Sequence, residues 1–140
     1  MKAERYSLAS LFILMALALG LTQCRDNGAT AALGPGSEYG IEVLGVELVG
    51  GGDLARLDYR VTDYEKAKRA LAGRIRLYSA DDSRSLEVIQ VGRLGPMRQR
   101  PSRRGVKQFI IFTNSGRLLQ SQGTAVLQIG AGRIPDIPVS

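Results

Sequence analysis

Hydrophobic and polar residues alternate in several short segments after residue 38, which is the pattern of half-buried β-strands. The clearest case is residues 55–61, ARLDYRV, where Leu57, Tyr59 and Val61 fall on one face and charged residues on the other. Turn-forming residues such as Gly, Asn, Asp and Ser separate the segments. This pattern predicts strands at 39–49, 55–61, 74–79, 86–91, 108–113, 124–129 and 133–139.

Three of these segments carry a further signal about their place in a sheet. Residues 39–49, YGIEVLGVELV, are partly apolar on both faces, so we expect this strand to be covered on both sides for part of its length. Residues 108–113, QFIIFT, hold four consecutive apolar residues, which is typical of a strand buried on both faces. Pro135 and Pro138 each remove a hydrogen-bond donor from the last segment, which favours an edge strand.

One segment has the composition of a helix instead. Residues 63–71, DYEKAKRAL, contain strong helix formers; Asp63 can cap the start and Gly73 can end the helix. The fold class expected from all of these elements is all-β: an immunoglobulin-like β-sandwich of about seven short strands with one short surface helix. The term refers to architecture alone, because the chain lacks the Cys…Trp…Cys core of antibody domains.

The N-terminus has the three parts of a secretory signal. Lys2 and Arg5 precede an uncharged run from Leu8 to Leu21, and polar residues follow. This run is shorter than the roughly 20 apolar residues that a stable membrane span needs. We therefore expect a signal peptide, as a signal helix, at 1–23, a flexible tether at 24–38 that begins with Cys24, and a β-sandwich domain at 39–140.

The stretch Leu21-Thr22-Gln23-Cys24 resembles the lipobox of bacterial lipoproteins. The resemblance implies cleavage before Cys24, acylation of Cys24, and a membrane-anchored protein of the cell envelope with its domain outside the cytoplasm. Gln23 departs from the family pattern, because a small residue usually precedes the cysteine. Cleavage at another position and an uncleaved anchor are the alternatives.

A second resemblance covers residues 40–139. The run Leu57–Val61 with Asp63, and later Phe109–Phe112 with Asn114–Arg117, is similar to a group of small exported bacterial proteins of unknown function. These motifs consist mostly of strand and turn residues. The resemblance therefore implies export and a β-domain, and it carries over no catalytic or binding residue.

Composition excludes several kinds of catalytic site. The chain has no histidine and one cysteine, so a Ser-His-Asp triad is excluded, and with Cys24 acylated so are a zinc site and a cysteine nucleophile. We expect neither a metal nor a cofactor. An enzyme that works with carboxylates alone is a less favoured alternative.

Charge is distributed unevenly along the chain, whose net charge is +6. Residues 88–135 contain eight basic residues and no acidic one. Most of the basic residues lie in the connection 92–107, GRLGPMRQRPSRRGVK, where Pro96 and Pro101 argue against a central strand. The residues expected to contact an anionic partner are Arg98, Arg100, Arg103, Arg104 and Lys107.

Three kinds of partner fit such a segment: anionic lipid, an anionic envelope polymer, or an acidic protein face. A solvated loop whose charge aids solubility is the plainer explanation. Nucleic acid is disfavoured, because no aromatic residues are interleaved with the cations. The sequence thus predicts a non-catalytic cell-envelope lipoprotein that acts as a structural or binding module, or alternatively an accessory subunit of an envelope export or respiratory assembly.

Overall fold

The computed structural model describes residues 34–81, 84–102 and 105–140. These described residues belong to one compact unit. The predicted signal peptide at 1–23, Cys24 and most of the predicted tether lie outside the described residues, and so do Arg103 and Arg104.

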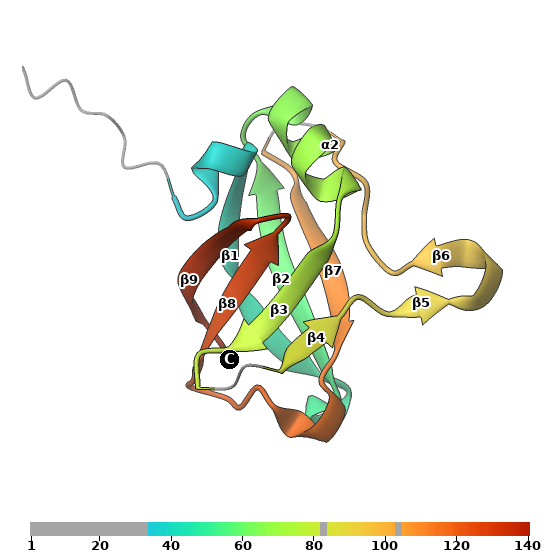
Figure 1. Cartoon of the computed structure of the whole chain (residues 1–140), viewed down its shortest axis with the longest axis vertical. Coiled ribbons are helices and arrows are strands. Elements are labelled where there is room, and N and C mark those ends of the chain that lie inside the picture. The colour runs from blue at the N-terminus through green and yellow to red at the C-terminus, as the bar shows by residue number, and fades with distance from the viewer. Residues whose placement is uncertain (1–33, 82–83, 103–104) are drawn as a thin grey trace, which may run out of the picture. The chain divides into compact units, whose positions relative to one another are not determined.

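The described chain is mostly β-structure with one α-helix, which confirms the all-β expectation (Figure 1). The elements are β1 (Ile41–Val49), β2 (Leu54–Val61), α2 (Tyr64–Ala72), β3 (Ile75–Ser79), β4 (Ser85–Glu87), β5 (Gln90–Val91), β6 (Gly95–Pro96), β7 (Lys107–Thr113), β8 (Thr124–Ile129) and β9 (Gly132–Pro138). They form a three-stranded sheet in the order β1-β2-β7, a four-stranded sheet in the order β4-β3-β8-β9, and a two-stranded ribbon, β5-β6. Neighbouring strands are antiparallel throughout.

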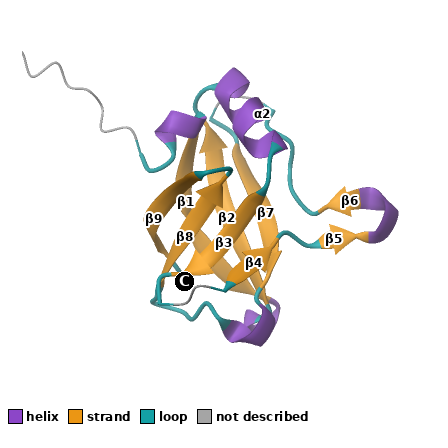
Figure 2. Cartoon of the chain, viewed as in Figure 1, coloured by secondary structure: helices purple, strands orange, loops and turns teal. Residues whose placement is uncertain are grey.

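The two larger sheets face each other, and their inward side chains form the hydrophobic core (Figure 2). Leu57 and Ile110 come from one sheet, and Leu77 and Leu127 come from the other; each is at most 1% exposed. A parallel bridge between Val46 and Val139 joins the sheets on one side, and a bridge between Val88 and Phe112 joins them on the other. Burial of this core supplies the main driving force for folding.

Strand β1 differs from the expectation of a strand covered on both sides. A β-bulge leaves Leu44 as an extra residue, because Val43 pairs with Tyr59 and Gly45 already pairs with Asp58. Gly45 has a φ of +153°, which other residues rarely adopt. The bulge shifts the alternation by one position, so Val43 and Val46 both face the core. Strict alternation would place Val43 and Val46 on opposite sides of the strand, but the bulge places both on its buried side.

Helix α2 and strand β9 agree with the sequence. The helix begins after Asp63, whose side chain accepts a 3.1 Å hydrogen bond from the Lys66 backbone N–H, and it ends before Gly73. Its apolar face buries Ala67 and Leu71. Strand β9 lies at the edge of its sheet, as Pro135 predicts.

The segment 86–101 is more ordered than the sequence implies. The expected strand at 86–91 is divided into β4 and β5, and β6 pairs with β5 to form a hairpin. Beyond β6, Met97 accepts a 3.0 Å hydrogen bond from the Ile111 N–H, and the Gln99 N–H donates one of 3.0 Å to Phe109. This part of the basic connection therefore lies along the free edge of β7. Local pattern does not reveal such pairing, because it depends on tertiary contact.

Candidate functional site

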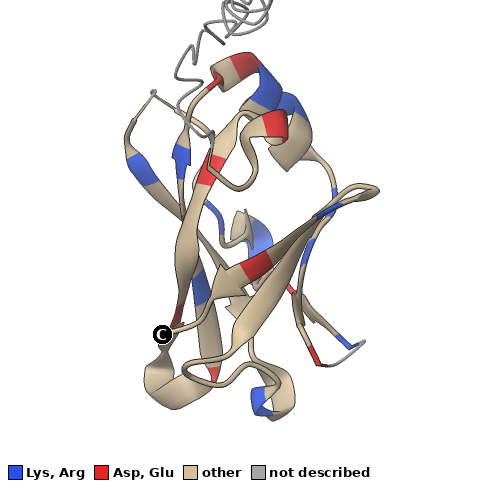
Figure 3. Ribbon diagram, turned by 90° about the vertical axis from the view of Figure 1, so that its left-hand side faces the viewer, with Lys and Arg blue, Asp and Glu red and all other residues tan. Residues whose placement is uncertain are grey.

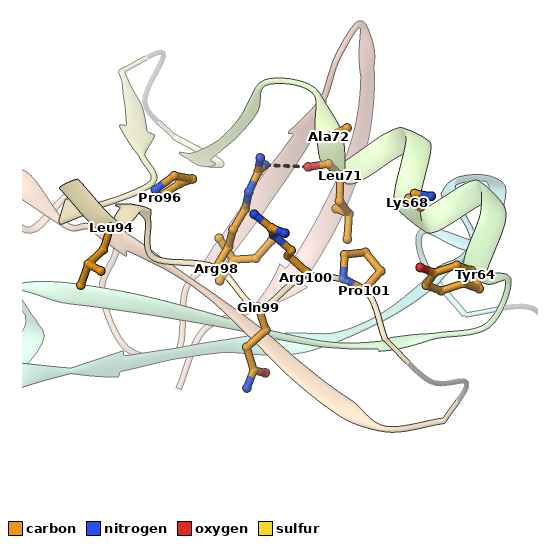
Figure 4. Close-up of a pocket in the computed structure, with 11 residues that line it drawn as sticks. Tyr64, Lys68, Leu71, Ala72, Leu94, Pro96, Arg98, Gln99, Arg100 and Pro101 are labelled. Carbon is orange, nitrogen blue, oxygen red and sulfur yellow. Dashed lines mark hydrogen bonds between the residues drawn. The ribbon is translucent and has the colours of Figure 1, made fainter. Parts of the chain in front are cut away.

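The basic segment forms one wall of a cleft of about 560 Å³ beside α2, here called the α2 cleft (Figure 4). The helix contributes the opposite wall, and Ile110 of β7 also lines the cleft. The lining residues are Tyr64, Lys68, Leu71, Ala72, Leu94, Pro96, Arg98, Gln99, Arg100, Pro101 and Ile110. The lining thus combines apolar side chains with three cations, and it includes no carboxylate among the described residues.

Tyr59 connects the wall of the α2 cleft that the basic segment forms to the core. Its ring is fully buried, and its hydroxyl donates a 3.0 Å hydrogen bond to the Gln99 carbonyl. Burial raises the pKa of Tyr59 to about 12, and the positive charge of Arg98 acts in the opposite direction. Tyr59 therefore stays protonated at neutral pH and continues to donate this bond.

Arg98 has a structural role in addition to its place in the lining. Its Nη1 donates a 2.6 Å hydrogen bond to the carbonyl of Leu71 (Figure 4) and a longer one of 3.4 Å to the carbonyl of Gly73. These carbonyls lie at the C-terminal end of α2, where the helix leaves its acceptors unpaired and a cation is favourable. Arg98 thus fastens the basic segment to the helix.

Arg100 and Lys68 present their charges to solvent across the α2 cleft. Both are exposed, and neither forms an ion pair with a carboxylate of the described residues. Lys68 was not among the residues expected to contact a partner. The helical spacing could have identified it, because Tyr64, Lys68 and Leu71 lie on one face of the predicted helix.

Lys107 lies elsewhere, and it has an acidic partner. Its Nζ is 2.8 Å from the Asp58 carboxylate, which also lies 3.1 Å from Arg56 Nε. The hydrogen bond to Asp58, followed by the charge of Asp58, raises the pKa of Arg56. Sequence reasoning missed this neighbour because Asp58 lies on β2, far away along the chain. Arg103 and Arg104 fall outside the described residues, so the α2 cleft contains Arg98 and Arg100 of the five expected contacts.

Two further features of the described residues bear on function. No group of three or more acidic, cysteine or histidine side chains comes close enough together there to hold a metal ion. Within the same residues, no helix has the length and apolar character needed to cross a membrane. Comparison with protein-family models, with characterised proteins and with solved structures finds no match in any of the three.

Proposed function

We propose that this chain is a lipid-anchored protein of the bacterial cell envelope whose immunoglobulin-like β-sandwich is a non-catalytic module that binds an anionic partner through the α2 cleft. The observation that carries the proposal is the joint presence of Lys68, Arg98 and Arg100 in one cleft whose described lining has no carboxylate. Arginine binds phosphate and carboxylate groups through two parallel hydrogen bonds, and lysine adds a point charge.

The position of the cations on rigid elements supports binding. Lys68 projects from α2, and the segment that carries Arg100 is held to β7 and to Tyr59 by hydrogen bonds at Gln99. An anion that enters the α2 cleft therefore meets charges whose backbone positions are already fixed. Such preorganisation reduces the entropy lost on binding.

The anchor is supported by the run of residues from Leu21 to Cys24, and it has its own test. Cys24→Ala should leave the leader uncut or move the protein from the membrane to the soluble fraction. Mass spectrometry of the mature N-terminus should find an acylated Cys24 in the unchanged protein. A processed, membrane-bound Cys24→Ala protein would contradict the lipid anchor.

Binding is tested with long-chain inorganic polyphosphate as the anionic probe. The double variant Lys68→Gln/Arg100→Gln should raise the Kd about tenfold at low salt, because two contacts worth somewhat under 1 kcal/mol each are lost. Fluorescence anisotropy of labelled polyphosphate measures this change, and added salt should reduce it.

The matched control is Arg60→Gln/Arg117→Gln, which removes the same charge from two exposed surface ion pairs outside the α2 cleft. Its Kd should rise by less than about threefold, since only the overall field of the protein changes. Equal losses in the two double variants would mean that net charge, rather than the α2 cleft, attracts the probe.

A further inference from the structure

A short hairpin next to the α2 cleft carries an unusually exposed hydrophobic side chain. Leu94 is 87% exposed, the highest value among the large hydrophobic residues that the structure describes as exposed. It lies in the turn Gly92–Leu94 between β5 and β6. The hairpin projects from the side of the two sheets (Figure 1). Leu94 therefore points away from the core of its own domain.

Hydrogen bonds fix the base of this hairpin. The Met97 N–H donates a 2.7 Å bond to the Ile89 carbonyl across the ribbon. The Ile89 N–H in turn donates a 3.0 Å bond to Ile111 of β7. These hydrogen bonds hold the hairpin against β7, and Leu94 is exposed in this fixed position.

Three of the four large exposed hydrophobic side chains in the described residues lie along the hairpin and the α2 cleft. These three are Tyr64, Leu94 and Met97, and the fourth is Val106. Tyr64 and Leu94 both line the α2 cleft, and Met97 follows β6 directly. A single exposed leucine is ordinary on a protein surface, whereas apolar groups that gather in one region mark a site of contact.

Cations lie on the same hairpin and line the same cleft as these apolar groups. Arg93 is next to Leu94 in the turn, and Lys68 and Arg100 lie across the α2 cleft. All three are exposed, and none forms an ion pair with a carboxylate in the part of the chain that is described. Apolar side chains bordered by Lys and Arg are the combination by which proteins bind the surface of an anionic bilayer.

We infer that the anionic partner is a phospholipid bilayer: Leu94 enters the boundary between head groups and acyl chains, while Lys68, Arg93 and Arg100 contact lipid phosphates. This inference rests on the proposed function, because it identifies the partner of the same cleft. A soluble anionic polymer would satisfy the cations and leave Leu94 in water. A bilayer satisfies both kinds of group.

The start of the domain is compatible with such docking. The turn Ser37–Tyr39 packs against α2, which forms one wall of the α2 cleft. Nine residues separate Cys24 from Gly34, so the ten steps of extended chain between them span at most about 35 Å. An acylated Cys24 would therefore keep the α2 end of the domain close to the bilayer, where weak contacts are sufficient because the effective concentration is high.

Tryptophan fluorescence tests the inference, because the chain has no tryptophan of its own. Leu94→Trp is introduced into the full-length chain, which is reconstituted into nanodiscs of phosphatidylcholine with or without phosphatidylglycerol. The leader, or the acyl chains on Cys24, hold every variant on the disc, so the emission reports contact of the hairpin rather than recruitment. The emission should shift to shorter wavelength and be quenched by brominated acyl chains when phosphatidylglycerol is present.

Two variants serve as controls. Ser121→Trp places the probe in an exposed turn outside the α2 cleft, and its emission should stay unshifted in both lipids. Adding Lys68→Gln/Arg100→Gln to Leu94→Trp should reduce the shift strongly, because two of the three phosphate contacts are lost.

The outcomes separate this inference from the function on which it rests. An unshifted Trp at position 94, together with polyphosphate binding that depends on Lys68 and Arg100, would overturn the bilayer and leave the anion-binding cleft. An equal shift in both lipids would overturn the role of lipid charge. An unshifted emission without such polyphosphate binding would overturn both proposals.

Discussion

Two basic regions of this molecule use the same residue types in opposite ways. On the outer face of β1, β2 and β7, each cation pairs with a carboxylate: Arg56 with Glu47 and Asp58, Arg60 with Glu42, and Lys107 with Asp58. In the α2 cleft, Lys68 and Arg100 have no such partner among the described residues, and Arg98 instead bonds to helix carbonyls. Figure 3, which colours charged residues on the ribbon, shows acidic and basic positions together on the strands.

The difference teaches how to interpret a basic composition. Charges that are paired across neighbouring strands help to fix register and add modest stability. Charges that lack a protein partner contribute nothing comparable to the fold, and they are available to a ligand. Substitution of a cation or polar group that is paired within the protein should therefore lower stability, whereas substitution of an unpaired cation in the α2 cleft should weaken binding.

Tyr59 lies on β2 and bonds to the basic segment, and its ionisation at alkaline pH should have the largest effect on stability. The pKa of Tyr59 is raised from its ordinary value of 10 to about 12, so the folded state holds this proton more tightly than the unfolded state. The resulting stability is fully present below pH 10 and is lost as the pH rises toward 12. The loss from this group amounts to about 2.7 kcal/mol, at 1.36 kcal/mol for each pH unit.

Tyr59→Phe removes this dependence on pH. At neutral pH the variant should be about 1 kcal/mol less stable, because the bond to Gln99 is lost. Near pH 11 the order of the two proteins should reverse. Urea unfolding followed by circular dichroism between pH 7 and pH 11.5 measures both effects, taken as order-of-magnitude expectations. A constant difference between the two proteins across this range would show that the folded and unfolded states hold the proton equally.

Asp58→Asn should give the next largest effect. The Asp58 side chain is 12% exposed and lies between Arg56 and Lys107, so its neutral replacement leaves two cations without their shared partner. We expect a loss of about 1.5 kcal/mol at low salt, and a smaller one at high salt. The matched control is Glu42→Gln, whose pair with Arg60 spans 3.8 Å between exposed side chains and should be worth at most about 0.5 kcal/mol. Equal losses of stability in the two variants would show that Asp58 contributes no more than an exposed surface ion pair.

Sequence periodicity was sufficient for much of the fold, because strands and helices leave local signals. The alternation at residues 55–61 corresponds to β2, and the capping signals at Asp63 and Gly73 correspond to the ends of α2. The bulge at Leu44 was not predictable, since alternation on either side of an inserted residue resembles two apolar faces. The sequence predicts about seven strands, and the described residues contain nine because the hairpin β5-β6 depends on tertiary pairing.

The site was predictable only in part, for the same reason. A segment without acidic residues identified Arg98 and Arg100, and both line the α2 cleft. It could not show that β7 pairs with β2 and so brings Lys107 beside Asp58. It also could not show which residues lie opposite, because Lys68 reaches the α2 cleft from a helix whose position depends on the packing of Ala67 and Leu71.

The smallest effect on stability, and the sharpest comparison, lies within the α2 cleft itself. Arg98→Gln removes the 2.6 Å hydrogen bond to the Leu71 carbonyl at the end of α2. It should therefore lower the free energy of unfolding by about 1 kcal/mol.

Arg100→Gln removes a charge from the same cleft. The side chain of Arg100 makes no hydrogen bond or ion pair with the rest of the described chain. This substitution should change stability by less than about 0.5 kcal/mol while it still weakens polyphosphate binding. Urea unfolding of both variants, with the polyphosphate Kd measured on the same samples, tests this division. If Arg100→Gln destabilised the protein as much as Arg98→Gln, the distinction between a cation that holds the helix and a cation kept for a ligand would fail.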